Sequence, residues 1–221
     1  MSAVLQSASV DLGEMLVAIA ASEGSASHPY THSYALNADP FANRNLADVL
    51  HLLAMLYGPQ PGLVELAADR NVAPEADDWF THAARGFSAE RAYLAQLIVA
   101  AGPGPSTPGE GDTAAAILDQ RRAMATIAAS DRFGCALGAA AGLVLDWQAV
   151  RAVLDTAAAR IGIDAAPCDL PDEAETAAML ARVPVSPRFD RAITFGARQI
   201  LAQQRGLWDV LEARTSARGA H

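Results

Sequence analysis

Apolar residues recur along this chain three or four positions apart, as on one face of a helix. No segment alternates between apolar and polar residues with a period of two. The pattern therefore predicts helices and no sheet. The expected helices cover residues 10–21, 46–57, 62–70, 73–101, 112–145, 147–162, 172–183 and 186 onward, the last with one apolar face of Phe189, Ile193, Ala197, Ile200, Gln204, Leu207 and Leu211.

Turn-forming residues set the boundaries of several of these helices. Gly58 is followed by proline and ends the second helix, and Gly162 ends the helix that begins at residue 147. Asp146 is expected to cap that helix at its N-terminus. Gly86 is a weak point in the segment 73–101, which we therefore expect as one long helix or as two, with Ser88 capping the second.

The stretch GPGPSTPGEGD, residues 102–112, is the one clear linker, because its prolines and glycines cannot continue a helix. No internal repeat relates the two halves that it separates. We therefore expect a single helical-bundle domain over residues 1–221, with a flexible connection at 102–112.

Composition supports an all-α fold. Hydrophobic residues make up 52% of the chain and aromatic residues 6%. Alanine is the most frequent residue and loses the least conformational freedom in a helix. We predict a bundle of about six to eight helices, four or five of them long. In helix number and length this outline resembles the ferritin-like bundles.

The resemblance to ferritin-like bundles implies a di-iron site built from Glu-x-x-His pairs on two helices. None of the nine glutamates has a histidine three residues later. A ferritin-like metal site is therefore absent or replaced in this chain.

Charge and composition exclude several classes of function. The formal net charge is −9, and all 16 basic residues are arginines. An acidic chain without a basic patch does not suit a nucleic-acid surface. Without lysine, Schiff-base and pyridoxal chemistry are excluded.

The localisation that the sequence predicts is cytoplasmic. The longest uncharged apolar run, residues 133–145, is too short to span a bilayer, and no secretion signal is indicated. Cys135 and Cys168 stand alone, in neither a metal-type nor a redox-type spacing.

Two pairs of side chains have spacings that suit a metal ion. Asp48 and His51 are three residues apart on a very apolar helix, and Asp78 and His82 are four residues apart on another. Together they form a workable set of two imidazoles and two carboxylates. The alternatives are a hydrogen-bonded core histidine for the first pair and a solvated helix pair for the second.

Three glycines recur every fourth residue in the segment SDRFGCALGAAAGLVLDW. On one helix, Gly134, Gly138 and Gly142 form a stripe without side chains, where a neighbour can approach closely. The neighbour is expected to be another helix of the chain or of a homodimer. The alternative is an apolar ligand such as a lipid tail or haem. Asp131, beside this stripe, is expected to be buried and paired with Arg91 or Arg198, or to line a pocket.

The stretch SHPYTHSYALN, residues 27–37, gathers histidines and tyrosines without an acid, cysteine or lysine. We expect it to be a loop whose tyrosines pack over the bundle, with Tyr30 and His32 as a secondary pocket rim.

Two functional hypotheses follow. The first is a non-catalytic bundle, expected to be a homodimer, that acts through self-association or partner binding, with no cofactor. The alternative is a bundle that binds a small molecule, a metal or haem in a core pocket around His51 and Asp131.

Overall fold

The computed structural model describes residues 11–71, 73–184 and 186–219, and all regular structure within them is helical. The α-helices are α1 (Leu12–Glu23), α2 (Tyr34–Asn37), α3 (Ala42–Tyr57), α4 (Leu63–Ala68), α5 (Asp77–Ala101), α6 (Glu110–Ala128), α7 (Cys135–Ile161), α8 (Glu173–Arg182) and α9 (Pro187–Gly219), and the single 3-10 turns are η1 (Ser25–Ser27), η2 (Pro29–His32) and η3 (Pro74–Ala76). The expected all-α bundle with several long helices is confirmed.

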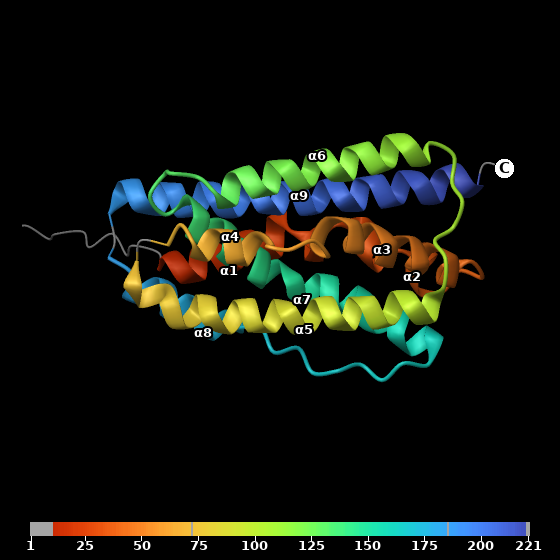
Figure 1. The fold of residues 1–221 in the computed structure, drawn as a ribbon, viewed down its shortest axis with the longest axis horizontal. Helices are drawn as coiled ribbons and strands as arrows, with labels where there is room; N and C mark the ends of the chain where they lie inside the picture. Colours follow the sequence, from red (N-terminus) through yellow and green to blue (C-terminus); the bar gives the residue numbers. More distant parts are fainter. Residues whose placement is uncertain (1–10, 72, 185, 220–221) are drawn as a thin grey trace, which may run out of the picture.

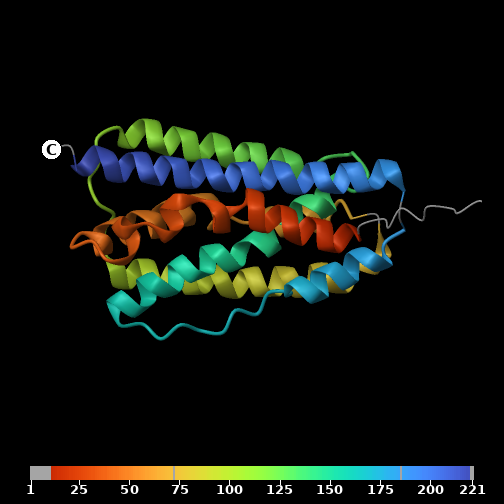
Figure 2. The ribbon, with the colours of Figure 1, turned by 180° about the vertical axis from the view of Figure 1, so that it is seen from behind.

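The long helices run roughly along the long axis of the molecule. Helices α6 and α9 lie side by side along one edge, and α5 lies at the opposite edge (Figure 1; Figure 2). Helix α7 packs against both α5 and α9, so it forms the centre of the bundle. The linker after α5 crosses from one edge to the other at the end where the C-terminus lies (Figure 1).

Most of the expected helix boundaries are confirmed within one to four residues. Gly58 caps the C-terminus of α3, and Gly162 caps that of α7 in the left-handed conformation with φ of 73°. Helix α8 begins with a capping box, in which Asp172 accepts from the backbone of Glu175 and the Glu175 carboxylate accepts from the backbone of Asp172. All seven residues of the expected apolar face on α9 are buried.

The single helix expected over residues 112–145 is wrong, because the chain turns between α6 and α7. Ser130 accepts a hydrogen bond from the backbone of Arg132, which closes a local turn. Gly134 then has a φ of 90°, a conformation that favours glycine, and α7 begins after it. Helix α7 continues through Asp146, so this residue is not the expected N-terminal cap.

Gly86 does not interrupt α5, which is one continuous helix. A Cβ atom at Gly86 would lie 2.3 Å from the carbonyl oxygen of Asp169. The glycine therefore serves a tertiary contact, since it lets the segment before α8 lie directly against the helix.

Among the described helices, α7 alone has the length and apolarity of a membrane span, but 83% of its most apolar window is buried inside the bundle. This is the pattern of a core helix.

Candidate functional site

The glycine stripe is filled by α9 of the same chain. A Cβ at Gly138 would lie 2.0 Å from the carbonyl oxygen of Ile193, and one at Gly142 would lie 2.9 Å from the Cα of Ala197. Gly134 precedes the helix and faces Phe189. The expected packing of a neighbouring helix is therefore what the structure shows, and no groove is left there for an apolar ligand.

The four residues expected to form a metal site lie apart. The ring of His51 donates from Nε2 to the carbonyl oxygen of Gly102, just after the end of α5, at 2.9 Å. His82 lies near the start of the same helix, 20 residues earlier. At a rise of about 1.5 Å per residue this is about 30 Å away. Asp78 is exposed. A single ion shared by Asp48, His51, Asp78 and His82 is excluded by this geometry.

Asp48 is buried between two arginines of α9. Arg214 donates to both of its carboxylate oxygens, with Nε 2.8 Å from Oδ2, and Arg218 donates to Oδ2 as well. These bonds occupy the oxygens that a metal would need. Asp48 and His51 do line a cavity of about 220 Å³ together with Arg214, but Asp131 is not part of it.

Asp131 is exposed, and the expectation that it is buried is wrong. Its side chain is 91% exposed and pairs with Arg70 at 2.9 Å. The burial expected from one helix face fails because the chain turns just before α7. The expected partners have other roles, since Arg91 pairs with Glu65 and Arg198 with Glu23.

The histidine- and tyrosine-rich stretch packs onto α9. Tyr30 is buried, its hydroxyl lies 2.6 Å from Oγ1 of Thr215, and burial raises its pKa. The ring of His32 is exposed and donates from Nε2 to the carbonyl oxygen of Ala26. Tyr30 thus packs over the bundle as expected, whereas Tyr34 is exposed. Neither Tyr30 nor His32 lines the largely apolar cavity described below.

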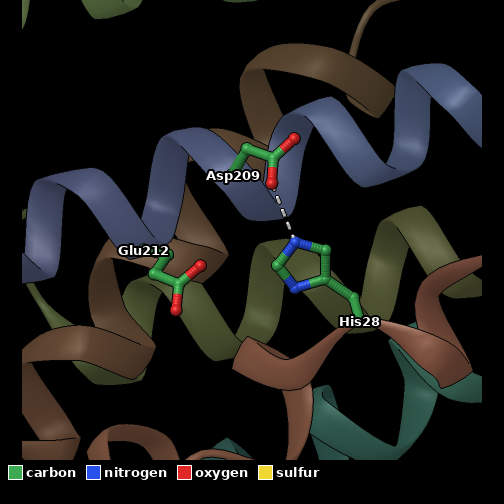
Figure 3. Close-up of side chains that lie close together, drawn as sticks. All are labelled: His28, Asp209 and Glu212. Atoms are coloured by element: carbon green, nitrogen blue, oxygen red, sulfur yellow. Dashed lines mark hydrogen bonds and ion pairs between the residues drawn. The ribbon is translucent and has the colours of Figure 1, made fainter.

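His28 forms a compact histidine–carboxylate group with Asp209 and Glu212 of α9 (Figure 3). Its Nε2 lies 3.0 Å from Oδ1 of Asp209, and its Nδ1 accepts from the backbone N–H of Tyr30. A neutral imidazole that accepts at Nδ1 carries its proton on Nε2. No lone pair then remains for a metal, so this group holds the loop on α9.

A buried ion pair joins α5 to α7. Nη1 of Arg151 lies 2.7 Å from Oε1 of Glu90, whose Oε2 accepts from the indole of Trp147 at 2.8 Å. Asp155 accepts from Arg151 and from Tyr93, and burial first and this carboxylate second raise the pKa of Tyr93 to about 12. Every charged group here has partners, which indicates a structural role.

Asp146 is a buried carboxylate without a bonded cation. It accepts from the backbone and the hydroxyl of Ser25, at 2.6 and 2.5 Å, and from Nε2 of Gln204 at 3.1 Å. The other end of the Gln204 amide accepts from the hydroxyl of Tyr57. Burial raises the pKa of Asp146, although these hydrogen bonds oppose the shift. Burial, and then the charge of Asp146, raise the pKa of Tyr57 well above its usual value.

Tyr57 also lines a cavity of about 270 Å³. The cavity lies between the end of α3, the turn at 59–62, and helices α4, α5, α6 and α7. Most of its wall is apolar. The buried apolar residues of the wall are Leu56, Leu63, Val64, Phe87, Met124 and Leu143.

One polar group, centred on Arg91, is built into this apolar wall. The Arg91 side chain is 13% exposed, and its Nη2 lies 2.6 Å from Oε1 of Glu65. The amide oxygen of Gln60 faces Nε and Nη2 of the same guanidinium, at 3.1 and 3.2 Å, in the orientation that satisfies both residues. Arg121 and Arg122 also line the cavity, and Arg122 pairs with Asp119.

Sequence reasoning missed this cavity, although it named Arg91 as a candidate partner of a buried carboxylate. An arginine among apolar positions was the available signal. The turn at 59–62 and α4 complete the site, and neither carries a recognisable motif.

Comparison with known proteins gives one match. A model of a family described as a family of unknown function (DUF6975) matches residues 20–219, which include every residue of the cavity. No curated protein and no solved structure matches the chain.

Proposed function

We propose a function for this chain, which belongs to the family of unknown function DUF6975, from its own cavity: it binds a small, largely apolar molecule between α3, α4, α5, α6 and α7. The observation that carries the proposal is the hollow of about 270 Å³ walled by leucine, methionine and phenylalanine side chains, with one largely buried guanidinium, that of Arg91, in its wall. Small-molecule sites combine a mainly apolar wall with a few placed polar groups in this way, and begin at about 300 Å³.

A ligand-binding core pocket was the alternative hypothesis from the sequence, but the cavity proposed as the site lies elsewhere in the bundle. The residues expected around it, His51 and Asp131, do not line it. It is also not a packing defect between poorly matched helices. Tyr57 and Phe87 in its wall each contact the ring of Trp147 at a centroid distance of 5.0 Å, so the wall behind them is closely packed.

The first test is binding of N-phenyl-1-naphthylamine, a neutral probe that fluoresces in apolar surroundings. Ala125 lines the cavity from α6, and Ala125→Phe should fill the hollow while the fold is kept. We expect saturable binding to the wild type and a loss of at least tenfold in affinity in the variant.

The matched control is Ala115→Phe, which adds the same ring at an exposed position of the same helix. Its affinity should equal that of the wild type. If the wild type does not bind the probe, or if both variants bind it equally, the proposal is wrong.

The homodimer and the cytoplasmic location remain predictions. The acidic charge supports a soluble cytoplasmic protein. The glycine stripe no longer supports a homodimer, because α9 of the same chain fills it. The ferritin-like resemblance rests on helix number and length alone.

A further inference from the structure

We infer that the ligand of this cavity is an organic acid with an apolar body, whose carboxylate binds at Arg91 and Arg121. The inference rests on the proposed function, because it names the class of molecule that the same cavity takes.

The guanidinium of Arg91 has one nitrogen that no protein group uses among the described residues. Its Nε and Nη2 are used by Gln60 and Glu65, which fix the plane of the guanidinium in the wall. Its Nη1 has no acceptor among the described residues. It is not one of the fully buried atoms without a partner, so it is open to solvent and can take an acceptor from a ligand. A carboxylate in the cavity would supply one, in a charge-assisted hydrogen bond.

The residues that line the cavity carry more positive than negative charge. Three arginines and one glutamate line it, whereas the whole chain has a formal charge of −9. Arg122 is neutralised by Asp119, and Arg91 by Glu65. Arg121 is half-buried and has no acidic partner in the described part of the chain. The cavity therefore has an excess of about one positive charge, which matches a monoanion.

Glu65 limits the charge of the ligand. Its Oε1 is already bonded to Arg91, so a cationic head group would have to compete with this ion pair. A dianionic head group such as a phosphate would bring more negative charge close to Glu65 than a carboxylate does. Oε2 of Glu65 is buried and has no donor among the described residues, which favours a donor on the ligand, and the alcohol and the amine in the experiment below test that alternative.

Gly62 keeps this polar group intact. A Cβ at Gly62 would lie 2.8 Å from Oε2 of Glu65 and 3.1 Å from Nη1 of Arg91. The turn before α4 therefore lies close over the ion pair, and a side chain at this position would require Glu65 or Arg91 to shift.

The experiment compares four molecules with the same body and different heads: 4-phenylbutanoate, 4-phenylbutan-1-ol, 4-phenylbutan-1-amine and 4-phenylbutyl phosphate. Their affinities for the full chain are measured by displacement of N-phenyl-1-naphthylamine. We expect the carboxylate to bind roughly tenfold or more tightly than the alcohol, because a hydrogen bond between charged groups is lost. The amine and the phosphate should bind more weakly than the carboxylate.

Two variants locate the head group. Arg121→Gln and Arg91→Gln should each lower the affinity for the carboxylate by about tenfold and leave the affinity for the alcohol unchanged. Arg121 has no partner to lose, so this variant keeps the inference testable if Arg91→Gln unfolds. Arg85→Gln is the control. Arg85 lies on α5 and forms an exposed pair with Asp169, so this variant removes the same charge away from the cavity.

The outcomes separate the two proposals. If no compound displaces the probe and the probe itself does not bind, the proposed function fails. Suppose that the alcohol binds as tightly as the carboxylate, or that the Arg121 and Arg91 variants lower the affinities for both equally. The cavity is then still a binding site, but the inference that its ligand is an organic acid is overturned. Preference for the amine or the phosphate also overturns it.

Discussion

Helix α7 has one side packed closely on α9 and another that forms part of the cavity wall. On the first side, a Cβ at Gly138 or at Gly196 would lie 2.0 to 2.1 Å from a backbone carbonyl of the other helix. On the second side, Leu143 faces long side chains from α4, α5 and α6 across a hollow of about 270 Å³. Glycine and alanine bring backbones into contact and leave no space, whereas leucine, methionine and arginine hold helices apart.

The largest loss of stability is expected where a substitution disturbs the close contact between α7 and α9. In Gly138→Ala the added methyl meets the backbone of Ile193, which cannot turn away as a side chain can. We expect the free energy of unfolding to fall by about 3 kcal/mol or more, measured by denaturant titration.

Gly206→Ala on α9 is the matched control. There the nearest atom to an added Cβ is the side-chain nitrogen of Gln120, at an ordinary 3.6 Å. This variant should gain about 0.5 to 1 kcal/mol from helix propensity. Equal effects in both variants would contradict close packing between α7 and α9.

A second prediction concerns Asp146 on α7. Gln204 of α9 donates to its carboxylate and accepts from Tyr57, which lines the cavity. Burial raises the pKa of Asp146 in the folded state, so the folded protein keeps a proton that the unfolded chain has released. Stability should therefore fall as pH rises from about 4, the usual Asp pKa, through the folded value.

This pH dependence should be smaller in Asp146→Asn, when the free energy of unfolding is measured at a series of pH values. Other groups near the carboxyl are Arg205 on α9 and Glu173 on α8, and both are unchanged in the variant. Identical slopes in the two proteins would show that another group titrates.

The smallest predicted effect is at Asp131. It precedes α7 and pairs with Arg70, and both side chains are exposed. Asp131→Asn should change the free energy of unfolding by no more than about 0.5 kcal/mol. A loss of several kcal/mol would show that the carboxylate is buried after all.

The sequence predicts the helices of this protein better than the places where they meet. Periodicity and caps located α3, α8 and α9, because both signals are local. At Gly86 the sequence left open one helix or two, and Gly134 was wrongly placed inside a helix. The first is explained by a distant segment that lies against it, and the second by a left-handed turn that apolar periodicity does not encode.

The candidate site could be predicted only in part. Glycine spacing correctly indicated a close helix contact, but it could not say that α9 was the partner. Spacing along each helix suggested Asp48 and His82 as metal ligands, whereas distant charges determine what they bind: Arg214 on α9 pairs with Asp48, and Asp169 before α8 pairs with His82. The cavity depends on which helices surround Leu143, and no local pattern contains that information.

The order of the helices along the chain has a consequence for synthesis. Helix α7 ends at Ile161, and α9, which covers its glycines, ends 58 residues later at Gly219. At about 5 to 20 residues per second, a ribosome needs about 3 to 12 s to make that interval. During this time the central helix of the bundle has no α9 to cover its glycines. A nascent chain stalled before α9 should therefore be the form that chaperones hold and that aggregates first.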